Sequence, residues 1–72
     1  MDTNTKLAIS LKKYLTDKNL SLDALSTKSG IEKYYIKDIL TCKVDPSLDI
    51  LMKLCHSLDI ELSTLIKEIE RF

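Results

Sequence analysis

The chain has 72 residues, of which 44% are hydrophobic and 31% are charged, with only one glycine and one proline. This length is below the usual size of one domain, so we expect residues 1–72 to form a single domain. The scarcity of Gly and Pro argues against a loop-rich, disulfide-stapled fold and against a β-sandwich. A deep cleft with a cofactor and a lid would barely fit, so we expect neither an enzyme nor a bound small molecule.

The charged residues are unevenly distributed, although the formal net charge is zero. Residues 1–27 carry a net charge of +1, residues 28–43 carry +2 and residues 44–72 carry −3. A basic face is the usual sign of a nucleic-acid-binding protein. The chain as a whole lacks this basic character, and only residues 28–43 favour nucleic-acid binding over an ordinary mixed surface.

Neither a membrane segment nor a metal site is expected. A transmembrane helix needs about 18 or more consecutive apolar residues, and the polar segment Met1–Thr5 does not resemble a signal peptide. We therefore expect a cytoplasmic protein. Cys42, Cys55 and His56 are too few to supply the usual four zinc ligands. We expect two free thiols, Cys55 on a buried helix face and Cys42 in a connection.

Hydrophobic spacing predicts a first helix over residues 5–18. Its apolar residues are Leu7, Leu11 and Leu15, with Ile9 and Tyr14 beside them. Asn19 can adopt a left-handed conformation and is expected to end this helix. Ser21 is a good N-cap for a second, short helix that runs to about Lys28.

The only glycine, Gly30, predicts a tight turn before a third helix over residues 32–41. Pro46 disfavours helix at the residue before it, and Ser47 is expected to cap a fourth helix. The apolar positions of that helix are Leu48, Leu51, Leu54, Cys55 and Leu58. After a break at residues 59–61, a fifth helix is expected over residues 62–72.

The second and third predicted helices, joined by the Gly-containing turn, form a helix-turn-helix pattern. Apolar residues are expected to fix the crossing of the two helices: Leu25, Ile31, Ile36 and Ile39. The outer face of the third helix is polar and suited to meet base edges in the major groove. It holds Lys33, Tyr34, Lys37 and Asp38.

Three segments make the pattern more specific: N-L-S-L-D-A-L-S (19–26), S-G-I (29–31) and D-P-S-L-D-I-L-M-K-L-C-H-S-L-D-I (45–60). In this order they resemble the Xre/Cro/phage-repressor family of helix-turn-helix proteins, from about Leu7 to Leu65. The resemblance implies an all-α fold, a compact five-helix lambda-repressor-like bundle in which helices 2 and 3 are the helix-turn-helix.

The resemblance also implies that the third helix reads DNA. Lysines such as Lys33 and Lys37 can donate to guanine or to phosphates, and Asp38 can accept from cytosine N4. Tyr34 and Tyr35 offer a hydroxyl to phosphate and a ring to a thymine methyl. For Tyr35, which is closer to the buried edge, packing is the alternative.

Further contacts to the DNA backbone are implied outside the third helix. The main-chain N–H groups at Ser21 and Leu22, which begin the second helix, are expected to clamp a phosphate. Lys43 matches a backbone-contacting position, whereas Lys28 is expected to add long-range attraction only.

Several residues depart from the family's pattern. Leu22 replaces a common Gln that touches both the DNA backbone and the recognition helix. Glu32 replaces a Ser or Thr cap, and Cys42 replaces a Gly. Leu15 and Leu40 replace an Arg and a Glu that often pair, and apolar packing between helices is an acceptable substitute for such a pair.

A homodimer is expected, because one recognition helix reads few base pairs and dimers span two half-sites about 34 Å apart on near-palindromic DNA. The predicted fifth helix carries an apolar stripe for this contact: Leu62, Leu65, Ile66, Ile69 and Phe72. Ile69 and Phe72 are the main candidates. The alternative is that the stripe completes the core of the monomer.

The sequence therefore predicts a sequence-specific DNA-binding transcriptional regulator, a repressor that occupies an operator as a homodimer, with no cofactor. One alternative is a protein-interaction module or antagonist with the same fold and weakened DNA binding, which the zero net charge, Leu22, Glu32 and Asp38 favour. Another is an antitoxin, which would also bind DNA but needs an additional toxin-binding segment.

Overall fold

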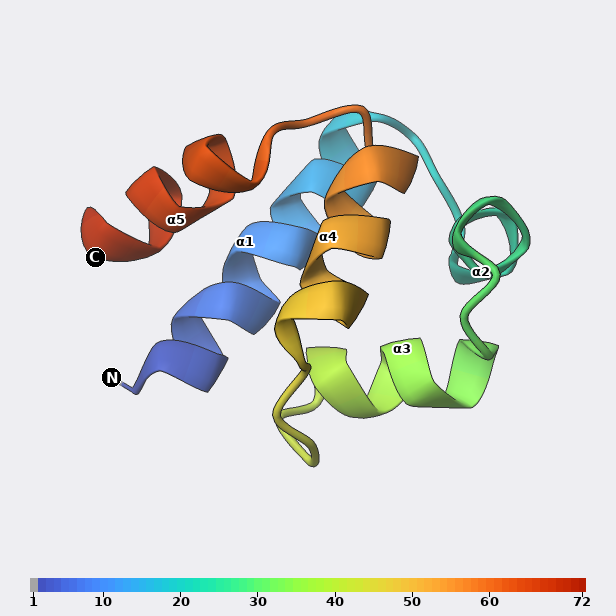
Figure 1. The fold of residues 1–72 in the computed structure, drawn as a ribbon, viewed down its shortest axis with the longest axis horizontal. Helices are drawn as coiled ribbons and strands as arrows, with labels where there is room; N and C mark the ends of the chain where they lie inside the picture. Colours follow the sequence, from blue (N-terminus) through green and yellow to red (C-terminus); the bar gives the residue numbers. More distant parts are fainter. Residues whose placement is uncertain (1) are drawn as a thin grey trace.

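A computed structural model describes residues 2–72, which contain five helices and no strand. These are α1 (Thr3–Asp17), α2 (Leu22–Ser29), α3 (Lys33–Leu40), α4 (Leu48–Ser57) and α5 (Leu62–Glu70). Helix α1 packs against α3 and α5, while α2 packs against α3 and α4. Figure 1 shows α5 on a different side of the molecule from α2 and α3, and α5 packs against neither of them. The predicted all-α, five-helix bundle is confirmed.

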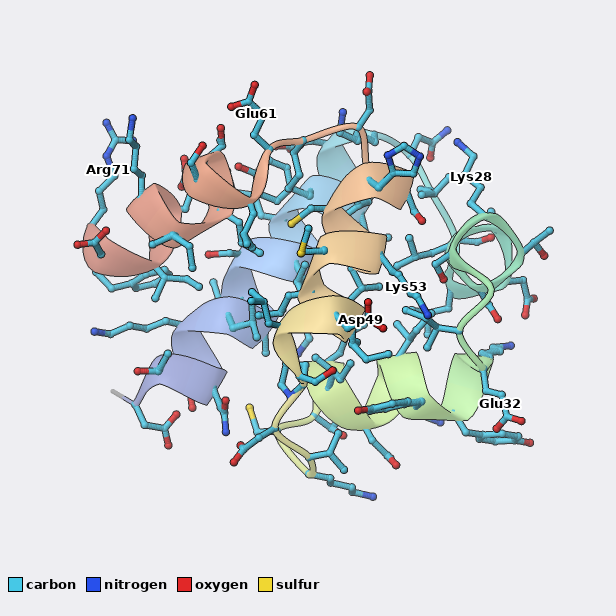
Figure 2. All side chains as sticks on the ribbon, viewed as in Figure 1. Lys28, Glu32, Asp49, Lys53, Glu61 and Arg71 are labelled. Atoms are coloured by element: carbon cyan, nitrogen blue, oxygen red, sulfur yellow. The ribbon has the colours of Figure 1, made fainter. Side chains whose placement is uncertain are left out.

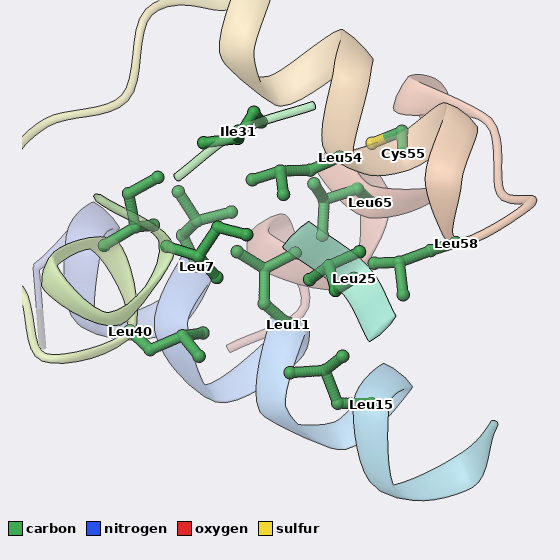
Figure 3. Close-up of a cluster of buried hydrophobic side chains, with 12 residues drawn as sticks. Leu7, Leu11, Leu15, Leu25, Ile31, Leu40, Leu54, Cys55, Leu58 and Leu65 are labelled. Carbon is green, nitrogen blue, oxygen red and sulfur yellow. The ribbon is translucent and has the colours of Figure 1, made fainter. Parts of the chain in front are cut away.

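All five helices contribute apolar side chains to one core (Figure 3). Its most completely buried members are Leu25, Ile36, Ile39, Leu54, Leu58 and Leu65. Burial of apolar surface of this kind contributes about 25 cal/mol per Å² and is the main stabilising term for the fold. Leu15 and Leu40 are also buried in this core, as expected for apolar replacements of a charged pair.

Side-chain caps determine where three of the helices begin. The Ser21 hydroxyl accepts a hydrogen bond from the Ala24 N–H, and Ser47 acts in the same way for α4. Both caps were predicted. Helix α1 begins at Thr3, earlier than the predicted residue 5, because the Asp2 carboxylate accepts from the Thr5 N–H at 2.7 Å. This bond also lowers the pKa of Asp2.

Four of residues 2–72 adopt the left-handed conformation where a helix ends or a turn begins. Asn19 (φ 53°) and Gly30 (φ 72°) were both expected to do so. Cys42 (φ 62°) and Asp59 (φ 57°) also do so. Cys42 therefore has a backbone conformation that favours glycine, the residue common here in the family that the sequence resembles, and a side chain at such a position costs free energy.

The remaining expectations concern helix ends, metals and membranes. Helix α3 begins at Lys33 rather than residue 32, and α5 ends at Glu70 rather than residue 72. Cys55 is buried and Cys42 is exposed, and both thiols are free. Within residues 2–72 no cluster of His, Cys, Asp and Glu is suited to hold a metal ion. No helix of the described chain is both long enough and apolar enough to cross a membrane.

Candidate nucleic-acid interface

Helices α2 and α3 form a closely packed pair. Leu25 on α2, Ile31 in the turn, and Ile36 and Ile39 on α3 are all buried, as the sequence predicted. Ile36 and Ile39 occupy the inward face of α3, and Tyr34 and Lys37 on its outer face are exposed. The helix-turn-helix is therefore built into the core and is not a loosely attached element.

Two serines hold the turn between α2 and α3. The Ser26 hydroxyl donates to the Ile31 carbonyl at 2.5 Å, and the Ser29 hydroxyl accepts from the Ile31 N–H at 3.2 Å. Both main-chain polar groups of Ile31 are thus satisfied by side chains of α2. Because the Ile31 side chain is buried, these bonds fix the position at which the chain enters α3.

The outer face of α3 presents most of the predicted DNA-contacting side chains to solvent. Tyr34 is 78% exposed. Lys33 and Lys37 are also exposed, and Asp38 is partly exposed. Tyr35 is half-buried and packs against the core, so the packing role considered for it is present. This arrangement leaves Tyr34 as the more accessible of the two tyrosines.

Lys33, the first residue of α3, forms an ion pair with α2 that the sequence did not predict. Its Nζ lies 2.9 Å from Oδ1 of Asp23. The hydrogen bond and the negative charge of Asp23 raise the pKa of Lys33. Leu22 cannot supply a polar link from α2 to α3, but Asp23, the next residue, does so. A periodicity argument could not find this pair, because it depends on how the two helices cross.

The N-terminus of α2 retains two main-chain donors. The Ala24 N–H is bonded to the Ser21 side chain, and the Leu25 N–H is bonded to the Ser21 carbonyl. Within residues 2–72 we find no acceptor for the N–H groups of Leu22 and Asp23. Such free donors at a helix N-terminus are suited to a phosphate. The Asp23 carboxylate lies in the same helical turn.

The other two lysines expected near DNA lie in different places. Lys43 follows α3, is exposed, and donates its main-chain N–H to the Asp38 carbonyl at 2.8 Å. Lys28 is at the C-terminal end of α2, where it borders a shallow hollow together with Met52 and His56 of α4. Lys28 and Glu32 lie on either side of the turn between α2 and α3, and Figure 2 shows the Lys28 side chain pointing away from Glu32.

The apolar stripe of α5 is divided between the core and the surface. Leu65 is 0% exposed, so its predicted place in a dimer interface is wrong: the side chain has no surface to offer a partner. Leu62 and Ile69 are partly buried against the core. Ile66 and Phe72 are 41% and 52% exposed. The sequence pattern could not separate these roles, because the whole stripe has helical spacing.

Comparison with known proteins is consistent with this geometry. A family model described as a Cro/C1-type HTH DNA-binding domain matches residues 10–70. No curated protein sequence gives a significant match.

Several solved structures share the fold. The restriction-modification controller protein C.AhdI from Aeromonas hydrophila is 31% identical, with a TM-score of 0.82 over 86% of this chain and 94% of that one. The clp gene regulator ClgR from C. glutamicum is 20% identical, with a TM-score of 0.90 over 99% of this chain and 92% of that one. The controller protein C.Esp1396I is 17% identical, with a TM-score of 0.90 over 99% and 91%. The match of the family model over most of the chain shows that this protein belongs to the Cro/C1-type helix-turn-helix DNA-binding family.

Proposed function

We propose that this protein is a sequence-specific transcriptional repressor that binds a near-palindromic operator as a homodimer. The observation that carries the proposal is the two-sided character of α3. One face is buried against α1 and α2, and the other presents Tyr34 and Lys37 to solvent. The similarity to C.AhdI, which is described as a controller protein, supports a regulatory role.

In the proposed complex the outer face of α3 enters the major groove. Lys37 and Lys33 donate to guanine edges or phosphates, Tyr34 contacts a phosphate or a thymine methyl, and Asp38 accepts from cytosine N4. The free N–H groups at the start of α2 and the ammonium group of Lys43 contact the DNA backbone and fix the orientation of α3. Repression follows from occupancy of the site and requires no cofactor. We place this activity in the cytoplasm and in a single domain, residues 1–72.

The proposed dimer uses the exposed part of α5. Ile66 and Phe72 form the apolar surface, with Leu62 and Ile69 at its edge where they also pack against the core. Because α5 does not pack against α2 or α3, this surface and the outer face of α3 can be occupied together. The acidic character of residues 44–72 also suits a face turned away from DNA.

A second candidate function is a protein-interaction module or antagonist with weakened DNA binding. The specific observation in its favour is the ion pair that occupies Lys33, together with the zero net charge. Under this function the same fold would bind a partner regulator and would show little affinity for DNA at any salt concentration.

Fluorescence anisotropy distinguishes the two functions. The labelled probes are a duplex from immediately upstream of the protein's own gene and a random duplex of equal length, each titrated at about 50 mM and about 200 mM KCl. The repressor hypothesis requires tighter binding to the upstream duplex and a steep loss of affinity with salt. Lys37→Ala should weaken this binding, while Lys67→Ala on α5 should not. Equal, weak binding of both duplexes at the lower salt concentration would rule out the repressor.

A further inference from the structure

The ion pair between α2 and α3 involves a lysine of the proposed DNA-binding face. Four lysines lie within residues 28–43, at positions 28, 33, 37 and 43. Among the described residues, only Lys33 of these four is within ion-pairing distance of a carboxylate. Both partners of the pair are largely exposed, so DNA can reach them.

Asp23 is placed where a DNA phosphate would compete with it. Its carboxylate accepts the Lys33 ammonium at 2.9 Å, which is the kind of contact that a phosphate oxygen would make. Asp23 also belongs to the first turn of α2, next to the unpaired N–H groups that are suited to a phosphate. A phosphate bound here must therefore compete with the carboxylate for Lys33 and lie close to a negative charge.

We propose that Asp23 is an intramolecular competitor of DNA, which holds Lys33 in the free protein and thereby lowers charge-driven binding to DNA of any sequence. This inference rests on the proposed function. Affinity for random DNA comes almost entirely from phosphate neutralisation by Lys and Arg. Withholding one lysine reduces that affinity and leaves base contacts by other residues of α3 unchanged. Asp23 is in this sense a positioning residue, because it acts on DNA through Lys33.

The test compares the wild-type protein with Asp23→Asn, Lys33→Ala and the double variant, using a labelled random duplex. Asp59→Asn is the charge-matched control. Asp59 follows the C-terminal end of α4, whereas α3 is joined to the N-terminal end of α4, so Asp59 and α3 are connected to opposite ends of that helix. Asn is close in size to Asp and Asp59 has a left-handed backbone that Asn tolerates, so both variants should fold. Melting temperatures check this.

Asp23→Asn should bind the random duplex roughly 3- to 10-fold more tightly than the wild type at about 50 mM KCl. It should lose about threefold more affinity than the wild type between about 50 and 200 mM KCl, because each additional phosphate contact adds about 0.9 to the slope of log K against log salt. When Lys33 is already replaced by Ala, Asp23→Asn should raise the logarithm of the affinity for the random duplex by at most half as much as it does in the wild-type background. Asp59→Asn should change affinity less than twofold.

A second readout does not depend on DNA. The pKa of Lys33, followed by NMR of its side chain, should fall in Asp23→Asn and stay unchanged in Asp59→Asn. If the variants bind DNA but Asp23→Asn gains no more affinity than Asp59→Asn, or gains equally with and without Lys33, this inference is wrong and the proposed function stands. If the pKa falls but no variant binds DNA, the proposed function is wrong, and the role of Asp23 fails with it.

Discussion

The Ser26 hydroxyl on α2 donates a hydrogen bond to the main-chain carbonyl of Ile31, 2.5 Å away in the turn before α3. Because Ile31 is buried, loss of the Ser26 hydroxyl leaves the Ile31 carbonyl without a hydrogen bond and poorly solvated. Leaving such a group unsatisfied costs about 1–3 kcal/mol. The side chain that fixes the start of α3 therefore comes from α2, the helix before it.

Ser26→Ala should consequently destabilise the protein by about 1–2 kcal/mol. For a domain of this size each kcal/mol lowers the melting temperature by about 4–8 °C. Thr27→Ala is the matched control, since the Thr27 hydroxyl also donates to a carbonyl, that of Asp23, but in an exposed position on its own helix. Thermal melting followed by circular dichroism measures both. Equal losses in the two variants would show that the Ser26 bond has no special role.

The left-handed backbone at Cys42 predicts that Cys42→Gly stabilises the fold. Glycine adopts this conformation without the cost of about 1–2 kcal/mol that other residues incur, although it loses more chain entropy on folding. We expect a net gain of about 0.5–1 kcal/mol in urea unfolding. Asn19→Gly should gain less, because Asn tolerates the conformation better. A loss of stability in Cys42→Gly would mean that the Cys42 side chain contributes more than its strain costs.

Helix α3, which we propose to be the recognition element, begins without a side-chain cap, because Glu32 makes no capping hydrogen bond. Glu32→Thr should supply one and raise the free energy of unfolding by about 1 kcal/mol. Ser21→Ala, which removes an existing cap from α2, should lower it by a similar amount. Urea unfolding tests the pair. If Glu32→Thr is neutral while Ser21→Ala is destabilising, the geometry at residue 32 does not accept a cap.

The proposed dimer makes a prediction about mass. Ile66→Asp places a charge in the exposed apolar surface of α5 and should give a monomer in light scattering at concentrations where the wild type is a dimer. Leu48→Asp is the control, because Leu48 is also an exposed apolar residue but lies on α4. Ile69→Asp is a poorer test, since Ile69 packs against the core and its substitution would also unfold the protein. A dimeric Ile66→Asp protein would contradict the interface.

The two cysteines should react at very different rates. Cys42 is exposed, whereas burial of Cys55 raises the pKa of its thiol. A disulfide reagent at about pH 8 should therefore modify one thiol quickly and the second only on unfolding, since the thiolate is the nucleophile. The raised pKa of Cys55 also affects stability, because at alkaline pH the folded state retains the thiol proton that the unfolded state loses. The contribution of Cys55 to stability should thus be complete below the unfolded pKa of about 8.5 and decline as the pH rises above it. Rapid modification of both thiols in the native protein would contradict the burial of Cys55.

The amino-acid sequence by itself determined the five helices, because their apolar spacing and the caps at Ser21 and Ser47 are local signals. It also located the turn at Gly30 and the inward face of α3. Periodicity reports which face of a helix is apolar, but not how much of that face a neighbouring helix covers. Only tertiary packing therefore decided that Leu65 is buried and Ile66 is exposed.

Polar contacts between helices also could not be predicted from the sequence. The Asp23–Lys33 ion pair and the Ser26–Ile31 hydrogen bond join residues whose approach depends on the crossing of α2 and α3. The zero net charge and short length of the chain said little about which lysines are available to DNA. Only the tertiary structure showed that Lys33 is paired with a carboxylate while Lys37 forms no ion pair among the described residues. The availability of a lysine depends on its partners in space and not on the count of charges.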